Sequence, residues 1–87
     1  MIPVKEAVSK AVEFAQTVLD PVRASQILLE EVDTGKLDSE EVWLITLSMP
    51  KPGAMSALLT AVRDYKTFTI NGQTGQVLSM RIRQIAA

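Results

Sequence analysis

Six acidic side chains between residues 30 and 41 form the densest group that could bind a metal ion. They are Glu30, Glu31, Asp33, Asp38, Glu40 and Glu41. Carboxylate oxygens are the ligands that Ca²⁺ and Mg²⁺ prefer. However, their order does not match the Asp-rich calcium loop that ends in a glutamate at its twelfth position. We therefore expect a solvated acidic hairpin, with no metal site and no cofactor.

Catalysis is restricted by two absences from the sequence. The chain of 87 residues contains no cysteine and no histidine, which removes Ser-His-Asp and Cys-His mechanisms and Cys-type zinc sites. Two carboxylates could still act as the acid and base of a glycoside hydrolase, or line a small-molecule cavity between a helix and a sheet. A chain this short leaves little room for a deep cleft beside its core. We expect no catalytic residues and no enzyme activity.

Basic side chains gather near the end of the chain, where Lys66, Arg81 and Arg83, with Arg63, could contact phosphates or an acidic partner. Nine basic and ten acidic residues give a net charge of −1, so no global field attracts nucleic acid or an anionic membrane. Tyr65 is the one evident base-stacking platform beside them. Arginines that protect a sheet edge from aggregation are the simpler interpretation. We expect neither a nucleic-acid nor a membrane partner.

The segment from Pro3 to Asp20 predicts an amphipathic helix. Its apolar residues recur at helical spacing, Pro3 suits the first turn, and Pro21 disfavours helical geometry at Asp20. The segment has no long apolar stretch of the kind found in export signals, and no run reaches the roughly 20 apolar residues that cross a bilayer. We expect a cytoplasmic protein with a single domain over residues 1–87. The apolar positions are Val4, Ala7, Val8, Ala11, Val12, Ala15, Val18 and Leu19.

The rest of the chain predicts four strands and one short helix. The strands cover residues 26–32, 42–49, 65–70 and 77–83, with a turn at 33–38, a helix of two or three turns at 54–63, and a hairpin turn at 71–76. Short connections favour an α+β fold, with the N-terminal helix packed on a four-stranded antiparallel sheet. Alternation predicts a covered face built from Trp43, Ile45, Leu47, Phe68, Ile70, Leu78, Met80 and Ile82 against Val8, Ala11, Ala15 and Val18.

The segment from Tyr65 to Met80 (YKTFTINGQTGQVLSM) resembles the pattern of PepSY-like domains. Those domains have a strand, a turn with Thr-Gly, and a second strand that opens with Val-Leu, and they belong to the wider cystatin-like α+β group. The resemblance implies a helix before an antiparallel sheet and a protein that binds or restrains peptidases. True cystatins block cysteine peptidases with a Gln-x-Val-x-Gly hairpin. The nearest segment here, Gln26 to Glu30 (QILLE), lacks the glycine.

The strand at 42–49 carries more apolar surface than one helix can cover, because both of its faces hold large apolar residues. Trp43 is expected in the core, although on the uncovered face it would be an interface residue. We therefore expect a non-enzymatic protein-interaction module that self-associates through its sheet as a homodimer or larger homo-oligomer. The alternative is a peptidase-binding regulator or inhibitor of PepSY-like type. The candidate interaction face comprises Leu44, Thr46, Thr67, Thr69, Arg81 and Arg83.

Overall fold

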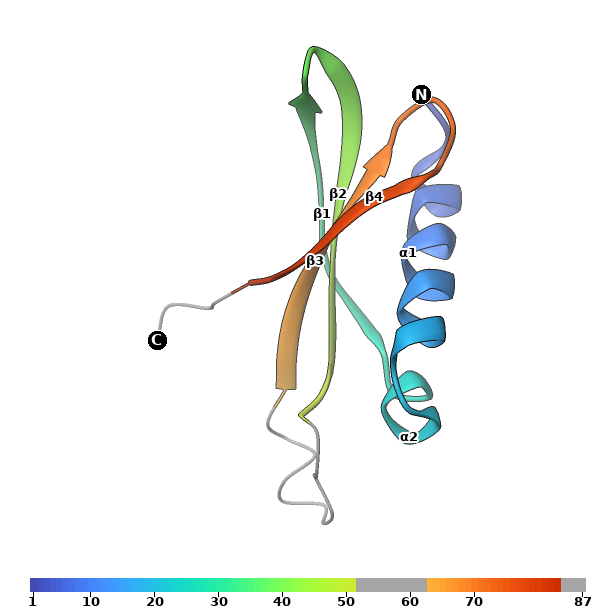
Figure 1. Cartoon of the computed structure of the whole chain (residues 1–87), viewed down its shortest axis with the longest axis vertical. Helices are drawn as coiled ribbons and strands as arrows, with labels where there is room; N and C mark the ends of the chain where they lie inside the picture. Colours follow the sequence, from blue (N-terminus) through green and yellow to red (C-terminus); the bar gives the residue numbers. More distant parts are fainter. Residues whose placement is uncertain (52–62, 84–87) are drawn as a thin grey trace.

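The computed structural model describes residues 1–51 and 63–83 of the chain. Two helices, α1 (Val4–Val18) and α2 (Pro21–Ala24), precede four strands: β1 (Leu28–Leu37), β2 (Glu40–Pro50), β3 (Arg63–Asn71) and β4 (Val77–Ile82). The strands form one antiparallel sheet in the order β1-β2-β3-β4, with α1 along one side (Figure 1). The predicted α+β fold, a helix on a four-stranded antiparallel sheet, is confirmed. The helix predicted at 54–63 lies outside the described residues, except that Arg63 begins β3.

Helix α1 approaches the sheet through its smallest side chains. Ala7, Ala11 and Ala15 are fully buried, and their spacing places them on one stripe of the helix. The helix ends at Val18, as expected from Pro21. Asp20 then caps α2, because its side chain accepts a hydrogen bond from the backbone N–H of Arg23 at 3.0 Å. The stripe of alanines brings the axis of α1 close to β2, β3 and β4, against which it packs.

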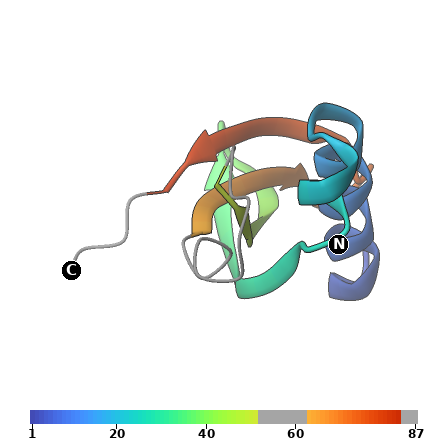
Figure 2. The same cartoon turned by 90° about the horizontal axis from the view of Figure 1, so that it is seen from below.

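The core lies between α1 and the middle strands of a strongly curved sheet (Figure 2). Phe68 is fully buried and meets Phe14 of α1 edge to face, with ring centroids 6.2 Å apart. Trp43 is half-buried against this core, and its indole N–H donates to the carbonyl of Ile2 at 3.0 Å. The fully buried apolar residues of the sheet are Ile45, Leu47, Met49, Phe68 and Ile70. The predicted core position of Trp43 is therefore confirmed, although the ring is not fully enclosed.

Three residues predicted for the covered face are exposed. Ile82 of β4 is 75% exposed, Val18 of α1 is 51% exposed and Leu78 of β4 is 39% exposed. A β-bulge explains Leu78: Thr69 pairs with Ser79 but Ile70 pairs with Val77, so Leu78 has no partner and Val77 takes its place. Ile82 keeps the alternation, but β4 has by then crossed away from α1 (Figure 1). Val18 stands in the last turn of the helix.

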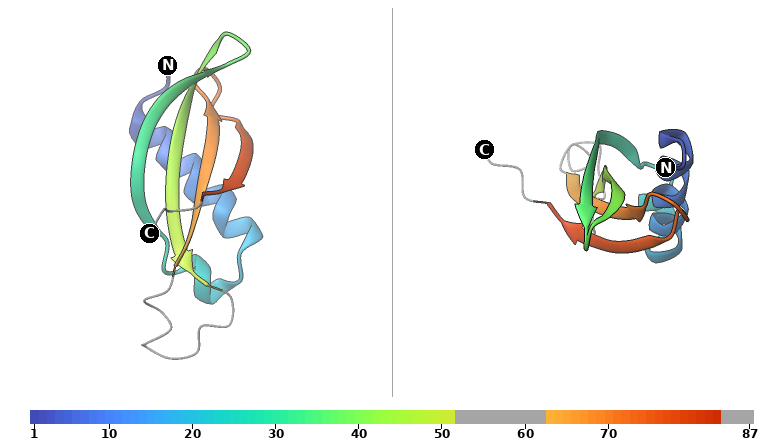
Figure 3. Two further views of the ribbon diagram at one scale, coloured as in Figure 1. Left: turned by 90° about the vertical axis from the view of Figure 1, so that its left-hand side faces the viewer. Right: turned by 90° about the horizontal axis from the view of Figure 1, so that it is seen from above.

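The first hairpin also differs from the prediction. β1 continues to Leu37 through the segment predicted as a turn, and the actual turn is Asp38-Ser39. Both residues have positive φ, 51° and 71°, as a two-residue turn that follows the twist of its strands requires. Gly35 lies inside β1, where a Cβ would stand 3.3 Å from Leu44 Cδ1. The glycine therefore makes room for a neighbouring side chain. The long twisted hairpin is seen from the side in Figure 3.

Candidate protein-interaction surface

The helix-free face of the sheet brings the six predicted interaction residues together. Thr46, Thr67 and Arg81 stand side by side across β2, β3 and β4, because Thr46 pairs with Thr67 and Thr67 with Arg81. Leu44 and Thr69 form the neighbouring row. Arg83 follows β4 and keeps the same alternation, with its backbone N–H donating to the carbonyl of Tyr65 at 2.8 Å. The alternation read from the sequence thus places all six on one face.

The centre of this face is closed by its own side chains. The guanidinium of Arg83 donates to Thr46 Oγ1 at 3.3 Å and also to the carboxylate of Glu31 on β1. Thr46 shares a 3.0 Å hydrogen bond with Thr67 and is only 3% exposed. Hydrogen bonding to Glu31 and its negative charge raise the pKa of Arg83 above its ordinary value. An ion pair therefore joins the two outer strands across the face, which is less open than the sequence predicts.

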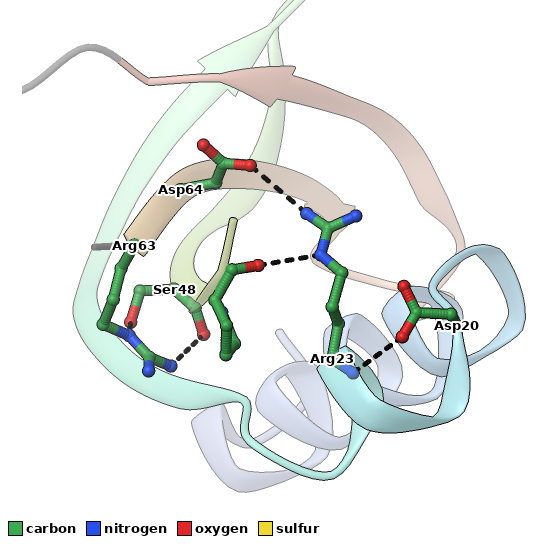
Figure 4. A network of polar contacts seen from close by, with 6 residues as sticks. Asp20, Arg23, Ser48, Arg63 and Asp64 are labelled. Atoms are coloured by element: carbon green, nitrogen blue, oxygen red, sulfur yellow. Dashed lines mark hydrogen bonds and ion pairs between the residues drawn. The ribbon is translucent and has the colours of Figure 1, made fainter. Parts of the chain in front are cut away.

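A polar cluster closes the far end of the same face (Figure 4). Ser48 is fully buried; its hydroxyl donates to Glu30 Oε2 at 2.7 Å and accepts from Arg63 Nε at 2.8 Å. The same guanidinium donates to the carbonyls of Ser48, at 3.0 Å, and Gln26. Without access to solvent, the hydroxyl of Ser48 cannot reach a substrate. We assign the cluster to holding β1, β2 and β3 together.

A second arginine joins α2 to the sheet beside this cluster (Figure 4). Arg23 donates from Nε to the carbonyl of Pro50 at 2.8 Å and from a terminal nitrogen to Asp64 at 3.2 Å. The side chain of Arg23 is 15% exposed and that of Asp64 is 30% exposed. These contacts give Arg23 and Asp64 structural roles, because they join α2 to the end of β2 and the start of β3.

The described residues offer no metal site in the acidic segment. In residues 1–51 and 63–83, no three carboxylates lie close enough to hold an ion. Glu30 and Glu31 instead contact Ser48 and Arg83. A hollow of about 370 Å³ between α1 and the turn after β3 is shallow, and Phe14 and Gly75 are among its lining residues. The helices described are too short or too polar to span a bilayer.

The outer edge of β1 is the exposed element that sequence reasoning missed. All of its ten residues are exposed except Gly35, which is half-buried. Leu29 and Val32 lie on the helix side, opposite Leu47 and Ile45, yet α1 leaves them in solvent. Among the described strands, β2 is the only one that pairs with β1. The outer edge of β1 therefore has no partner strand among the described residues and can bind another strand, although the N–H of Thr34 already donates to Asp33 Oδ1 at 2.8 Å.

The outer edge of β4 is the second exposed edge and carries the opposite charge. Arg81 and Ile82 are exposed, and Arg83 follows them, with no acidic residue in the segment from Val77 to Arg83. β1 instead carries three acidic residues and one lysine. The signal available in the sequence was the mixture of apolar and acidic residues along residues 28–33. Comparisons with family models, with curated proteins and with solved structures found no match to this chain.

Proposed function

We propose that this protein is a non-enzymatic interaction module that self-associates through its sheet. The observation that carries the proposal is the outer edge of β1, ten residues long and exposed along its length. Long exposed edges with apolar side chains favour pairing with another strand. The edge is a better site than the helix-free face, because Thr46 at the centre of that face is covered by Arg83.

Burial of apolar surface supplies the driving force. Leu28, Leu29, Val32 and Leu37 on β1 are between 38% and 52% exposed. Full burial of such a side chain contributes about 1.5–3 kcal/mol, so covering the part that remains exposed contributes roughly 1 kcal/mol for each residue. Backbone hydrogen bonds along the edge would add to this and fix the alignment of the partner strand.

The absence of histidine and cysteine from the whole sequence supports a role without catalysis. Ser48, whose hydroxyl is held by Glu30 and Arg63, is fully buried. The conserved chemistry of a hydrolase, a nucleophile beside a general base at an open cleft, has no counterpart among the described residues.

Sedimentation velocity over a concentration series tests self-association. We expect the mass of the wild-type protein to rise with concentration, and the Val32→Lys variant to remain monomeric at every concentration. Val22→Lys is the matched control, because Val22 is 64% exposed on α2, away from the edge. A wild-type protein that is strictly monomeric would overturn the proposal, as would equal effects of the two lysine substitutions.

A peptidase-binding regulator is the second candidate. Its supporting observation is that the segment resembling PepSY-like domains forms a β-hairpin, β3 to β4, with Gly75 of the Thr-Gly pair at a φ of 78°. Binding and inhibition assays against cysteine, serine and metallopeptidases test this role. An absence of both binding and inhibition across the panel would count against it.

A further inference from the structure

We propose that the protein associates head to tail, with β1 of one copy pairing antiparallel to β4 of the next. This inference rests on the proposed self-association and specifies its occupant, a second copy of this chain. In the sheet, β1 and β4 are the two outer strands and run in opposite directions. A second molecule placed beside the first, and rotated to follow the twist of the sheet, therefore continues the antiparallel sheet.

Charge distinguishes this arrangement from the symmetric ones. β1 carries Glu30, Glu31 and Asp33 against the single Lys36, so two β1 edges would bring acidic residues together. Two β4 edges would bring Arg81 and Arg83 of both copies together. Like charges on facing strand positions are destabilising, whereas opposite charges contribute favourably. The pairing of β1 with β4 is the one that places opposite charges along the edge.

The alignment of the two edges matches charge to charge and apolar to apolar. With Glu31 opposite Arg83 of the next copy, Asp33 faces Arg81 and Val32 faces Ile82. The two charged pairs lie on the helix-free face, and the apolar pair lies on the helix side. Val32 and Ile82 are 38% and 75% exposed in the single copy, so this contact would cover the most exposed large apolar residue of the sheet.

The backbone groups agree with this alignment. The N–H of Arg83 points inward to Tyr65, so that of Ile82 points outward, because neighbouring residues of a strand alternate. Glu31, Thr46, Thr67 and Arg81 form one row across the sheet. Along this row, each strand directs its backbone N–H and C=O groups to one neighbouring strand only. The backbone groups of Glu31 therefore point inward, to β2, and those of Val32 point outward. Val32 and Ile82 can thus exchange both backbone hydrogen bonds.

The two β-bulges set the limits of the contact. On β1 the irregularity lies between Leu29 and Glu31, and on β4 it falls at Leu78. The regular part of the β1 edge is 31–37 and that of the β4 edge is 79–83, so residues 31–35 can face 79–83 without an irregularity. Within a single copy, Glu31 already bonds Arg83, so association exchanges this ion pair for an equivalent one between copies. Association should therefore be weak and reversible.

Mixing two variants that each block one edge tests the head-to-tail arrangement. Val32→Pro removes an outward N–H from β1, and Ile82→Pro does the same on β4, without loss of a hydrogen bond inside the sheet. We expect each variant to be monomeric alone and the mixture to form a 1:1 dimer that grows no further. The wild-type protein should form larger species as concentration rises, since heterologous contacts propagate. Circular dichroism and Trp43 fluorescence check that each variant is folded.

Charge exchange provides a second measurement if a proline variant fails to fold. Asp33→Arg and Arg81→Asp should each weaken association, and the double variant should restore it. If the Ile82→Pro variant still associates by itself, the contact is a symmetric one between two β1 edges. If the Val32→Pro variant still associates by itself, the contact is a symmetric one between two β4 edges. Either result overturns the head-to-tail inference, while self-association stands. A monomeric wild-type protein would instead refute the proposed function itself.

Discussion

A methyl group added at Gly72 should destabilise the protein more than one added at Gly75. Gly72 lies where three segments meet: its N–H donates to the carbonyl of Glu41 at 2.9 Å, and its carbonyl accepts from Ile2 at 2.6 Å. A Cβ at this position would stand 2.6 Å from that same carbonyl oxygen of Glu41 and 2.8 Å from Met1 Sδ. Because the oxygen belongs to the backbone of β2, it cannot move away without moving the strand.

The magnitude follows from two contributions. Overpacking costs about 1–3 kcal/mol, and loss of the hydrogen bond to Glu41 costs about 1 kcal/mol, so Gly72→Ala should cost about 3 kcal/mol. At Gly75 a Cβ would meet Ile2 Cδ1 at 3.4 Å, which is ordinary contact, but φ is 78°. The left-handed conformation costs alanine about 1–2 kcal/mol.

Urea denaturation followed by Trp43 fluorescence measures both costs. Asparagine is the control, because it tolerates the left-handed conformation better than alanine. Gly75→Asn should recover part of the stability lost in Gly75→Ala, whereas Gly72→Asn should be no better than Gly72→Ala. In thermal denaturation, about 3 kcal/mol corresponds to a fall in Tm of roughly 12–24 °C for a domain of this size. Recovery by asparagine at Gly72, or a smaller loss there than at Gly75, would refute the steric explanation.

Three further outcomes follow from the core and the charges. Phe68→Ala should cost about 3–5 kcal/mol in urea denaturation. Leu78→Ala should cost only about 1 kcal/mol, because the bulge leaves Leu78 partly exposed; equal losses would contradict the register. Trp43→Phe removes the hydrogen bond to Ile2 and should cost about 1 kcal/mol, measured by circular dichroism. The pKa of Arg83 is raised in the folded state, so its contribution to stability is fully present below the unfolded-state pKa and is lost only as the pH rises through the folded-state pKa. Arg83→Lys should therefore leave the pH dependence of stability between pH 6 and 9 unchanged.

The elements of the fold could be predicted closely where periodicity and prolines agree. The predicted helix at 3–20 contains α1, because Pro3 and Pro21 limit it on both sides. The strand predicted at 42–49 lies within β2, because this segment is a dense run of β-branched and aromatic residues. β1 was predicted too short because Thr34-Gly35 resembles a turn. The glycine instead leaves space for Leu44, and Asp38-Ser39 adopts positive φ without any glycine.

The candidate surface could be predicted only in part. Alternation correctly placed Thr46, Thr67 and Arg81 on one face, because that depends only on residues within each strand and its register. It could not reveal the closure of that face by Arg83 and Glu31, which are 52 positions apart in the sequence. Nor could it reveal that β1 lies at an edge, because strand order is set by the packing of the whole sheet.

The meander order of the strands also governs how the chain folds. Each strand pairs with its neighbour in the sequence, and β1 and β2 are joined by a turn of two residues. The two-residue turn closes the β1–β2 hairpin at little cost in loop entropy, whereas the contact between Ile2 and Gly72 joins residues far apart in the sequence and costs more. We therefore expect the hairpin, with its acidic β1 edge, to form before α1 docks on the core. A partner strand that binds this edge early would compete with the last steps of folding.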